Sequence, residues 1–444
     1  MRSTREQRGW YFYDWANSAY VTTTGTVLYG PYLTSVARTA AGCPDHGTCD
    51  ARLHVLGLPI APGSLFFYTV TFATLFSAVL LPVLGAIADR RGDKRRLLGI
   101  FAWIGAVAAT LMFFVSGSAW LFGSLLLVVA NLALGGSLVV YDAILIDIAA
   151  PDDRDRVSSR GWAWGYVGGG LLLVVNLILV MMPERFGMDT TMAVRVSLAS
   201  AGIWWGLWTI IPYRRIVDRG VTVAAASGPV VRAAFRQLAD TLRDLRHYPH
   251  TSLFLLAYLF FNDGVQTVIS AASVYGAEEL GLSQSVLIGS IVLVQIVAFG
   301  GAMLFGRRAA RAGAHRAIRD SLIVWIIAVT IGYFLPSHAI APFLLLAAVL
   351  GTVLGGIQAL SRSLFSQLVP RSREAEYFSL YQACERGTSW LGTLVFGLIH
   401  QWTGSYRPAI VSLVAFFIIG GLLLRRVDVR RGIAEAGNVA PAVV

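Results

Sequence analysis

Two apolar segments of the sequence each carry one charged residue on a stripe of helical spacing. In segment 120–149 the stripe ends at Asp142, and in segment 341–368 it ends at Arg362. The other members, at intervals of four, three and four residues, are Asn131, Gly135 and Leu138 in the first stripe and Gly351, Gly355 and Gln358 in the second. A charge inside a membrane helix costs about 2.5–3.5 kcal/mol, so it persists only where it is paired or faces water.

Asp142 and Arg362 also correspond to each other under an internal repeat. The offset of 220 residues between them relates Gly135 to Gly355 as well. An acid and a base at equivalent depth predict a mutual pair or a jointly bound zwitterion. Two interpretations remain open, because the pair can be a salt bridge that closes a cytoplasmic gate or part of a substrate site.

Segment 251–275 adds a second set of buried polar groups. Tyr258, Asn262 and Gln266 recur at intervals of four residues, with Asp263 beside them. Burial favours the protonated form of a carboxyl group, and Asp263 has no basic residue in reach on its own helix, so we expect a protonatable coupling carboxylate. The competing interpretation is a neutral, hydrogen-bonded acid with a packing role. The candidate cavity residues are Asp14, Asn17, Asn131, Asp142, Asn262, Asp263, Gln266, Gln358 and Arg362.

A basic loop follows segment 63–88 and reads GAIADRRGDKRR from Gly85 to Arg96. A glycine permits close approach of helices, and Asp89 can accept hydrogen bonds from N–H groups at the N-terminus of a neighbouring helix. The alternative is a loop that only sets membrane orientation. We expect a conformational gate made of Gly85, Asp89, Arg90, Gly92, Glu385 and Arg386.

These residues require long apolar helices to position them. The chain of 444 residues is 56% hydrophobic and only 14% charged, whereas soluble domains carry about 25% charge. A helix needs about 20 apolar residues to span the hydrocarbon core. Twelve segments qualify: 10–36, 63–88, 97–116, 120–149, 161–182, 192–212, 251–275, 286–305, 317–336, 341–368, 378–400 and 407–424. The sequence therefore predicts an all-α membrane protein.

The distribution of charge predicts the orientation of these helices. The net charge is +11, but the basic residues lie between apolar segments and alternate from loop to loop, which indicates membrane topology and not a nucleic-acid interface. We expect both termini in the cytoplasm and a multi-pass location in the inner (plasma) membrane. Cys43 and Cys49 share one external loop and can pair there on an oxidising side.

The repeat divides the chain into two six-helix bundles. We expect bundles at 1–212 and 251–426, a cytoplasmic loop at 213–250 with a basic amphipathic helix, and a cytoplasmic tail at 427–444. The central loop is a tether in the simpler interpretation and a regulatory element in the other. No phosphate-binding loop and no HExxH pattern occurs, so we expect neither an enzyme nor a bound metal or cofactor.

Several motifs together resemble one known family. The loop from Gly85 to Arg96 is similar to the GxxxDRxGR[RK] signature of the major facilitator superfamily. The segments WYFYDWANSAY from Trp10, GWAWGYVGGG from Gly161 and GGIQALSRS from Gly355 resemble the branch that holds the fungal vacuolar autophagy-related effluxers and their bacterial relatives. The resemblance implies twelve transmembrane helices in two pseudo-symmetric bundles, a cavity lined by helices 1, 4, 7 and 10, and, for the fungal members, export of amino acids. Bacterial relatives tend to have Gly-Lys where this chain has Glu385-Arg386.

Together these observations predict a secondary active or facilitative transporter. We expect alternating-access movement of a small polar or zwitterionic solute, such as an amino acid, with protons as coupling ion, and a monomer in contact with membrane lipids. Two other functions remain open. A transporter-derived sensor or scaffold need not maintain buried charges, and multidrug-type efflux would suit a more apolar cavity.

The predicted orientation can be tested by cysteine labelling. A membrane-impermeant thiol reagent on reduced intact cells should modify Cys43 or Cys49, because both lie in an external loop. It should not modify an Ala225→Cys variant at its introduced site in the central loop. The reverse pattern would overturn the orientation.

Overall fold

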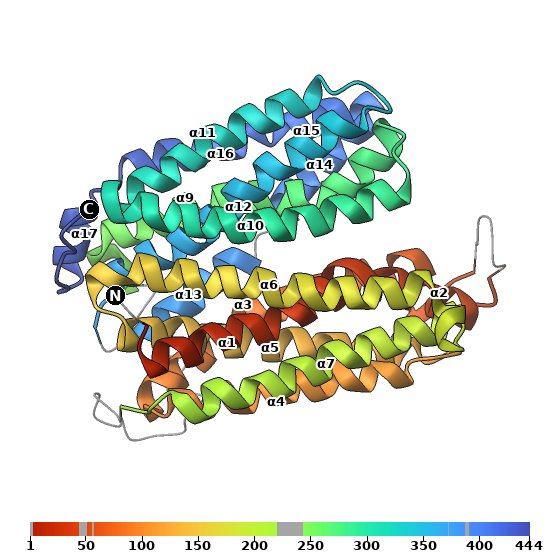
Figure 1. Cartoon of the computed structure of the whole chain (residues 1–444), viewed down its shortest axis with the longest axis horizontal. Helices are drawn as coiled ribbons and strands as arrows, with labels where there is room; N and C mark the ends of the chain where they lie inside the picture. The colour runs from red at the N-terminus through yellow and green to blue at the C-terminus, as the bar shows by residue number, and fades with distance from the viewer. Residues whose placement is uncertain (1–2, 44–50, 56, 220–242, 372, 387–389) are drawn as a thin grey trace. The chain divides into compact units, whose positions relative to one another are not determined.

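The described part of the chain is almost wholly helical (Figure 1). The computed structural model describes residues 3–43, 51–55, 57–219, 243–371, 373–386 and 390–444. Its α-helices are α1 (Arg5–Tyr20), α2 (Tyr29–Ala40), α3 (Leu65–Arg91), α4 (Lys94–Leu111), α5 (Trp120–Ile148), α6 (Arg154–Met181), α7 (Thr190–Arg215), α9 (Pro249–Val274), α10 (Gln284–Ala312), α11 (Ala314–Tyr333), α12 (Ile340–Leu368), α13 (Glu374–Arg386), α14 (Trp390–Thr403), α15 (Tyr406–Ser412), α16 (Val414–Arg425) and α17 (Val429–Glu435).

Within these described ranges, nine helices are long and apolar enough to cross a membrane. They coincide with nine of the twelve predicted segments, so the prediction of an all-α, multi-pass membrane protein is confirmed. The other three segments are built differently. Segment 10–36 contains a π-helix at Val21–Leu28 between α1 and α2, segment 317–336 corresponds to α11, and segment 378–400 falls on α13 and α14. The number of twelve spans stays a prediction.

The loop between α2 and α3 contains a small β-hairpin that the sequence did not indicate. Strands β1 (Leu53–Val55) and β2 (Leu58–Ile60) pair antiparallel, with Leu53 opposite Ile60. Gly57 in the turn has φ +84°, a left-handed conformation that glycine adopts without strain. Cys43 of the same loop is disulfide-bonded.

The described helices form two compact units. Unit 1 comprises 1–80, 95–138 and 167–217, and unit 2 comprises 81–94, 139–166 and 218–444. Each unit therefore contains segments that are far apart in the sequence. The predicted bundles at 1–212 and 251–426 rest on the repeat and stay a prediction, and the predicted amphipathic helix falls largely on 220–242, outside the described residues.

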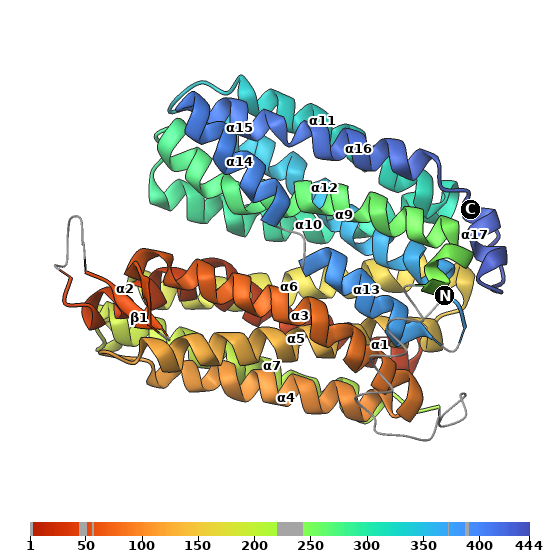
Figure 2. The ribbon, with the colours of Figure 1, turned by 180° about the vertical axis from the view of Figure 1, so that it is seen from behind.

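Aromatic rings and close helix contacts hold unit 1 together. Trp15 of α1 stacks on Trp204 of α7 with ring centroids 5.5 Å apart. A Cβ atom on Gly202 of α7 would lie 2.4 Å from the backbone nitrogen of Thr110 in α4, so only glycine allows this approach. Figures 1 and 2 show α4 and α7 side by side along their length.

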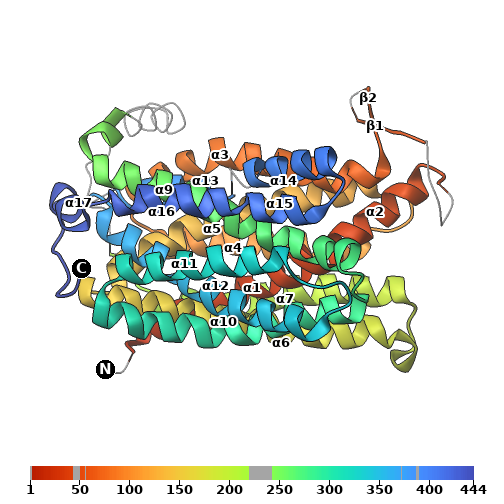
Figure 3. The ribbon, with the colours of Figure 1, turned by 90° about the horizontal axis from the view of Figure 1, so that it is seen from above.

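Unit 2 is built around the second half of the chain. Helix α9 packs against α16, which Figure 3 shows running beside it, and α10 packs closely against α12. The ends of α3 and α5 and the beginning of α6 also belong to this unit, although they come from the first half of the chain. Unit 2 therefore combines segments from both halves of the chain.

Candidate functional site

The structure places Asp142 and Arg362 in contact inside unit 2. Arg362 Nη1 on α12 lies 3.4 Å from Asp142 Oδ1 on α5, and both side chains are at most 3% exposed. The guanidinium also donates to Ser158 of α6, from Nε to Oγ at 3.0 Å and from Nη2 to the carbonyl at 3.1 Å. It lies over the rings of Tyr141 and Trp162 at 5.3 and 5.4 Å. These aromatic faces and hydrogen bonds stabilise a charge removed from water.

A glutamine that the sequence analysis did not select joins this pair to α13. Gln382 Nε2 donates to Asp142 Oδ2 at 2.7 Å and also lies 3.2 Å from Glu385 Oε2. Glu385 was expected in a gate with the Asp89 loop, within the predicted segment 378–400. Because α13 already begins at Glu374, Glu385 instead lies at the helix's C-terminal end and joins the group around Asp142.

Amide side chains extend the polar network from α13 to α9 and α12. Asn262 Nδ2 of α9 donates to the carbonyl of Glu385 at 3.2 Å, and Gln358 Nε2 of α12 donates to Asn262 Oδ1 at 3.1 Å. Both amides are buried. The predicted residues Asp142, Asn262, Gln358, Arg362 and Glu385 are thus connected through hydrogen bonds in one compact unit.

Asp263 points to a different helix from its neighbour Asn262. Its Oδ2 accepts the N–H of Gly392, the third residue of α14, at 2.8 Å. Its Oδ1 is buried and accepts no hydrogen bond from the described residues, and the whole residue is 0% exposed. One oxygen therefore meets the positive end of a helix, while the other is buried and accepts no hydrogen bond from the described residues.

The Asp89 carboxylate caps the N-terminus of α13. Oδ1 accepts the N–H of Ala375 at 3.0 Å and Oδ2 accepts the N–H of Glu376 at 2.8 Å. Gly85, one turn earlier on α3, allows this contact, since a Cβ there would lie 2.5 Å from the carbonyl oxygen of Ala375. Gly92 has φ +66° and ends the helix. The structure thus brings Asp89 to the helix terminus that the sequence suggested.

A lysine and an arginine complete the charge pattern around the start of α13. Lys94 Nζ lies 3.1 Å from Asp147 of α5 and 3.7 Å from Glu374, so this lysine of the Gly85–Arg96 loop pairs with both acids. Arg373 binds Glu376 through two nitrogens and also contacts Asp244. Burial lowers the pKa of Arg373, but the hydrogen bonds and charges of these acids more than offset it and raise the pKa above the ordinary value.

Helix α6 is joined to α12 by three further hydrogen bonds. Arg154 Nη1 donates to the carbonyl of Ser366 at 2.8 Å, Ser158 Oγ donates to the carbonyl of Ala359 at 2.7 Å, and Ser363 Oγ donates to Asp155 Oδ1 at 2.5 Å. All three connect the first half of the chain to the second. Polar contacts of this kind can exchange with water when two surfaces separate, which suits a contact that forms and breaks.

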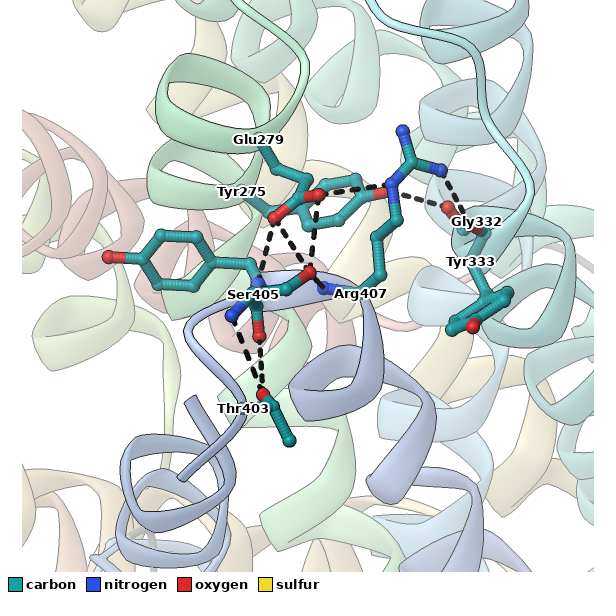
Figure 4. A network of polar contacts seen from close by, with 8 residues as sticks. Tyr275, Glu279, Gly332, Tyr333, Thr403, Ser405 and Arg407 are labelled. Carbon is teal, nitrogen blue, oxygen red and sulfur yellow. Dashed lines mark hydrogen bonds and ion pairs between the residues drawn. The ribbon is translucent and has the colours of Figure 1, made fainter. Parts of the chain in front are cut away.

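A separate polar cluster lies where η7 (Tyr275–Glu279) approaches α15, as Figure 4 shows. The carboxylate of Glu279 accepts hydrogen bonds from Ser405 Oγ, from the N–H of Tyr406 at 2.8 Å and from Arg407 Nε at 3.0 Å. Arg407 Nη1 also donates to the carbonyl of Tyr333 at 2.7 Å. The hydroxyl of Tyr275 donates to the carbonyl of Gly332 at 2.5 Å. This cluster fastens three helix ends to one another.

The remaining predicted residues lie elsewhere or are only partly described. Asp14, Asn17 and Asn131 belong to unit 1, where Asn17 donates to the carbonyl of Tyr13 in its own helix at 2.7 Å. Gln266 is half-buried on α9. The side chains of Arg90 and Arg386 lie outside the described residues.

Comparisons with known proteins agree on one family. The profile of the family described as "Vacuole effluxer Atg22 like" matches residues 2–437. The uncharacterized MFS-type transporter YxiO of Bacillus subtilis is 30% identical over 426 residues, which cover 95% of each chain. Autophagy-related protein 22 of Kluyveromyces lactis is 24% identical and covers 99% of this chain and 96% of its own.

Solved structures of major facilitator transporters share the fold. A bacterial homologue of the iron transporter ferroportin superimposes with a TM-score of 0.67 at 13% identity, over 96% of this chain and 98% of its own. The proton:xylose symporter XylE superimposes with a TM-score of 0.67 at 12% identity, over 96% of this chain and 94% of its own. The fold and the family resemblance inferred from the sequence are confirmed.

The capping contact of Asp89 gives a direct test of the gate. Asp89→Asn leaves one acceptor oxygen for the two N–H groups and places an amide NH₂ against one of them. Transport should therefore fall about tenfold, the loss expected for one charge-assisted hydrogen bond. Membrane insertion should be normal. Asp93→Asn is the matched control in the same loop and should transport normally. Normal transport by Asp89→Asn would reduce the motif to an orientation signal.

Proposed function

Since the chain belongs to the Atg22-like family of vacuole effluxers within the major facilitator superfamily, we propose that it moves a small polar or zwitterionic solute across the membrane by alternating access. The observation that carries this proposal is the buried Asp142–Arg362 pair. It joins α5 to α12, two helices from opposite halves of the repeat, within a network of hydrogen bonds. This contact between the halves is small and polar, and both charged groups are hydrogen-bonded. Such a contact is suited to a gate that opens and closes.

The partners of Arg362 favour the gate interpretation over the substrate site. Arg362 contacts Asp142 and Ser158, both from the first half of the chain. The Arg154–Ser366 and Ser363–Asp155 hydrogen bonds nearby also connect the two halves. In the proposed cycle these contacts close the predicted cytoplasmic end. Opening that end would separate α12 from α5 and α6 and release the pair.

The polar character of this network supports a polar solute. Asn262, Gln358, Gln382 and Glu385 present amide and carboxylate groups in one region of unit 2. Such groups recognise the ammonium and carboxylate of a zwitterion, and an amino acid fits this chemistry. If the network opened around a hydrophobic drug, its amide and carboxylate groups would lose their present partners without gaining new ones. A scaffold that does not transport has no need for a buried charge pair. We also place the protein in the cell membrane, as the sequence leads us to expect.

Asp263 is the proposed proton-coupling group. Its Oδ1 has no hydrogen-bond partner among the described residues and is buried, so a proton there would remove an uncompensated charge. Its Oδ2 remains bonded to Gly392 in α14. Protonation would therefore change the charge at the N-terminus of α14.

Transport assays on the full chain test this proposal. Purified protein in liposomes should move at least one amino acid from a labelled panel, and a pH gradient should drive its accumulation. Asp263→Asn keeps an acceptor for Gly392 but cannot ionise, so it should lose the response to the gradient while retaining exchange of labelled for unlabelled solute. Absence of transport for every amino acid tested, in protein that is monodisperse and folded, would contradict the proposed substrate class.

A double-mutant cycle tests the Asp142–Arg362 pair. Asp142→Asn or Arg362→Gln alone leaves one buried charge without its partner, which costs about 3–5 kcal/mol. Each single variant should express poorly, and the double variant should recover expression. Recovered expression without transport would support a gating or substrate role, and recovered transport would mark the pair as structural.

The surface pair Arg308–Asp320 is the matched control. Its side chains are 55% and 40% exposed, with nitrogen and oxygen 2.6 Å apart. Exposed pairs contribute about 0–1 kcal/mol, so Arg308→Gln and Asp320→Asn should each behave like the wild type. Purely additive defects in the Asp142 and Arg362 variants would show that these two residues are not coupled.

A further inference from the structure

The last helix of the chain is folded against the end of α12. Asp428 caps α17 by accepting the N–H of Arg431 at 3.0 Å. At the other end Gly437 has φ +68°, and the N–H of Asn438 donates to the carbonyl of Ile433 at 3.0 Å. This arrangement is a common helix termination, and it fixes the position of Asn438. The predicted tail at 427–444 therefore contains a folded helix with defined ends.

Apolar contacts hold α17 in this place. Ile433 is 1% exposed and Val429 is also buried. A Cβ atom on Gly432 would lie 2.8 Å from the side chain of Leu368, the last residue of α12, and 2.9 Å from His250. The N–H of Asp428 also donates to His250 Nδ1 at 3.1 Å. Helix α17 thus packs on the ends of α12 and α9.

Asn438 satisfies two carbonyl groups at the end of α12. Its Nδ2 donates to the carbonyl of Gln367 at 2.9 Å and to that of Val369 at 2.7 Å. The last carbonyls of a helix have no partner within the helix, so burial would leave these groups unsatisfied without a donor from elsewhere. A residue without a side-chain N–H donor at position 438 could therefore not replace Asn438.

The neighbouring carbonyls are satisfied from other parts of unit 2. Arg154 of α6 donates to Ser366, and Thr251 Oγ1 of α9 donates to Leu368 at 2.8 Å. Four consecutive carbonyls, from Ser366 to Val369, thus receive side-chain donors from α6, α9 and the tail. Of these donors, only Arg154 comes from the first half of the chain and must release its bond when the proposed gate opens.

The tail also reaches the first half of the chain. The N–H of Ala442 donates to Asp152 Oδ1, directly before α6, at 2.6 Å. The stretch from Asn438 to Ala442 therefore runs from the end of α12 to the beginning of α6. It connects the same two helices that Arg154, Ser158 and Ser363 join.

We propose that Asn438 is a positioning residue of the gate, which holds the end of α12 where Arg362, Ser363 and Ser366 face α6, with Ala442 as a second attachment at Asp152. This inference rests on the proposed gating role of these contacts. The tail acts through α12 and touches no transported solute. It stabilises the closed arrangement of this end relative to the open one.

Thiol accessibility measures this effect without a substrate. Ser366 is 0% exposed on α12, so Ser366→Cys in a Cys384→Ser background reports opening of the contact with α6. The assay uses the purified full-length protein and a water-soluble maleimide. Asn438→Asp keeps the size of the side chain but removes both donors, and labelling should accelerate about tenfold, as loss of two neutral hydrogen bonds implies.

Matched variants separate positioning from general damage. Val439→Asp adds the same charge at an exposed neighbour and should leave the labelling rate unchanged. Asp152→Ala removes the second attachment and should also accelerate labelling, whereas Asp153→Ala, whose side chain pairs with Arg156, should not. If Asn438→Asp fails to fold, as judged by size exclusion, Asp152→Ala tests the proposal alone.

The outcomes distinguish this proposal from the proposed function. Unchanged labelling in folded Asn438→Asp and Asp152→Ala, or equal acceleration in the two controls, would overturn the positioning role. Accelerated labelling together with absence of amino-acid transport would support the positioning role and count against the substrate class only.

Discussion

The guanidinium of Arg362 on α12 is buried, and its burial dictates what must surround it. A charge removed from water needs an opposite charge, hydrogen-bond acceptors and polarisable neighbours. Asp142, Ser158, Tyr141 and Trp162 supply these. Because they come from α5 and α6, satisfying one side chain of α12 commits three helices to one arrangement. Gln382 then extends the same requirement to α13.

Helix ends impose a similar requirement. Where water is scarce, free N–H and C=O groups at a terminus need partners from the protein. Asp89 meets this need at the start of α13, and Arg154, Thr251 and Asn438 meet it at the end of α12. Each partner belongs to another element, so the hydrogen bonds that satisfy a helix end also connect that helix to its neighbour. A few such bonds break at modest cost, which an interface of interlocked apolar side chains would not allow.

The fold followed from the sequence because its main determinants are local. Apolar length and helical period are read along the chain, and the repeat offset placed Asp142 opposite Arg362. Contacts that depend on packing were not accessible in this way. The start of α13 was misjudged because Glu374 and Glu376 are charged, and because the cap of this helix, Asp89, lies 286 residues before Ala375 in the sequence. Gln382, Ser158 and Asn438 carry no distinguishing pattern, since an isolated amide or hydroxyl occurs in many loops and helices.

Lys94 is the only lysine in a chain whose other basic side chains, histidines apart, are arginines. It lies between Asp147 and Glu374, where the end of the first basic loop meets the start of α13. Guanidinium groups do not react with the acylating reagents that modify amines. The side-chain amine of Lys94 is therefore a unique site of modification within this junction. Acylation would convert its ammonium, which lies between two acids, into a neutral amide and would leave the arginines at the membrane surface unchanged. Among the side chains, acylation would thus alter this one contact without mutagenesis, wherever the 14% exposed amine of Lys94 is reached.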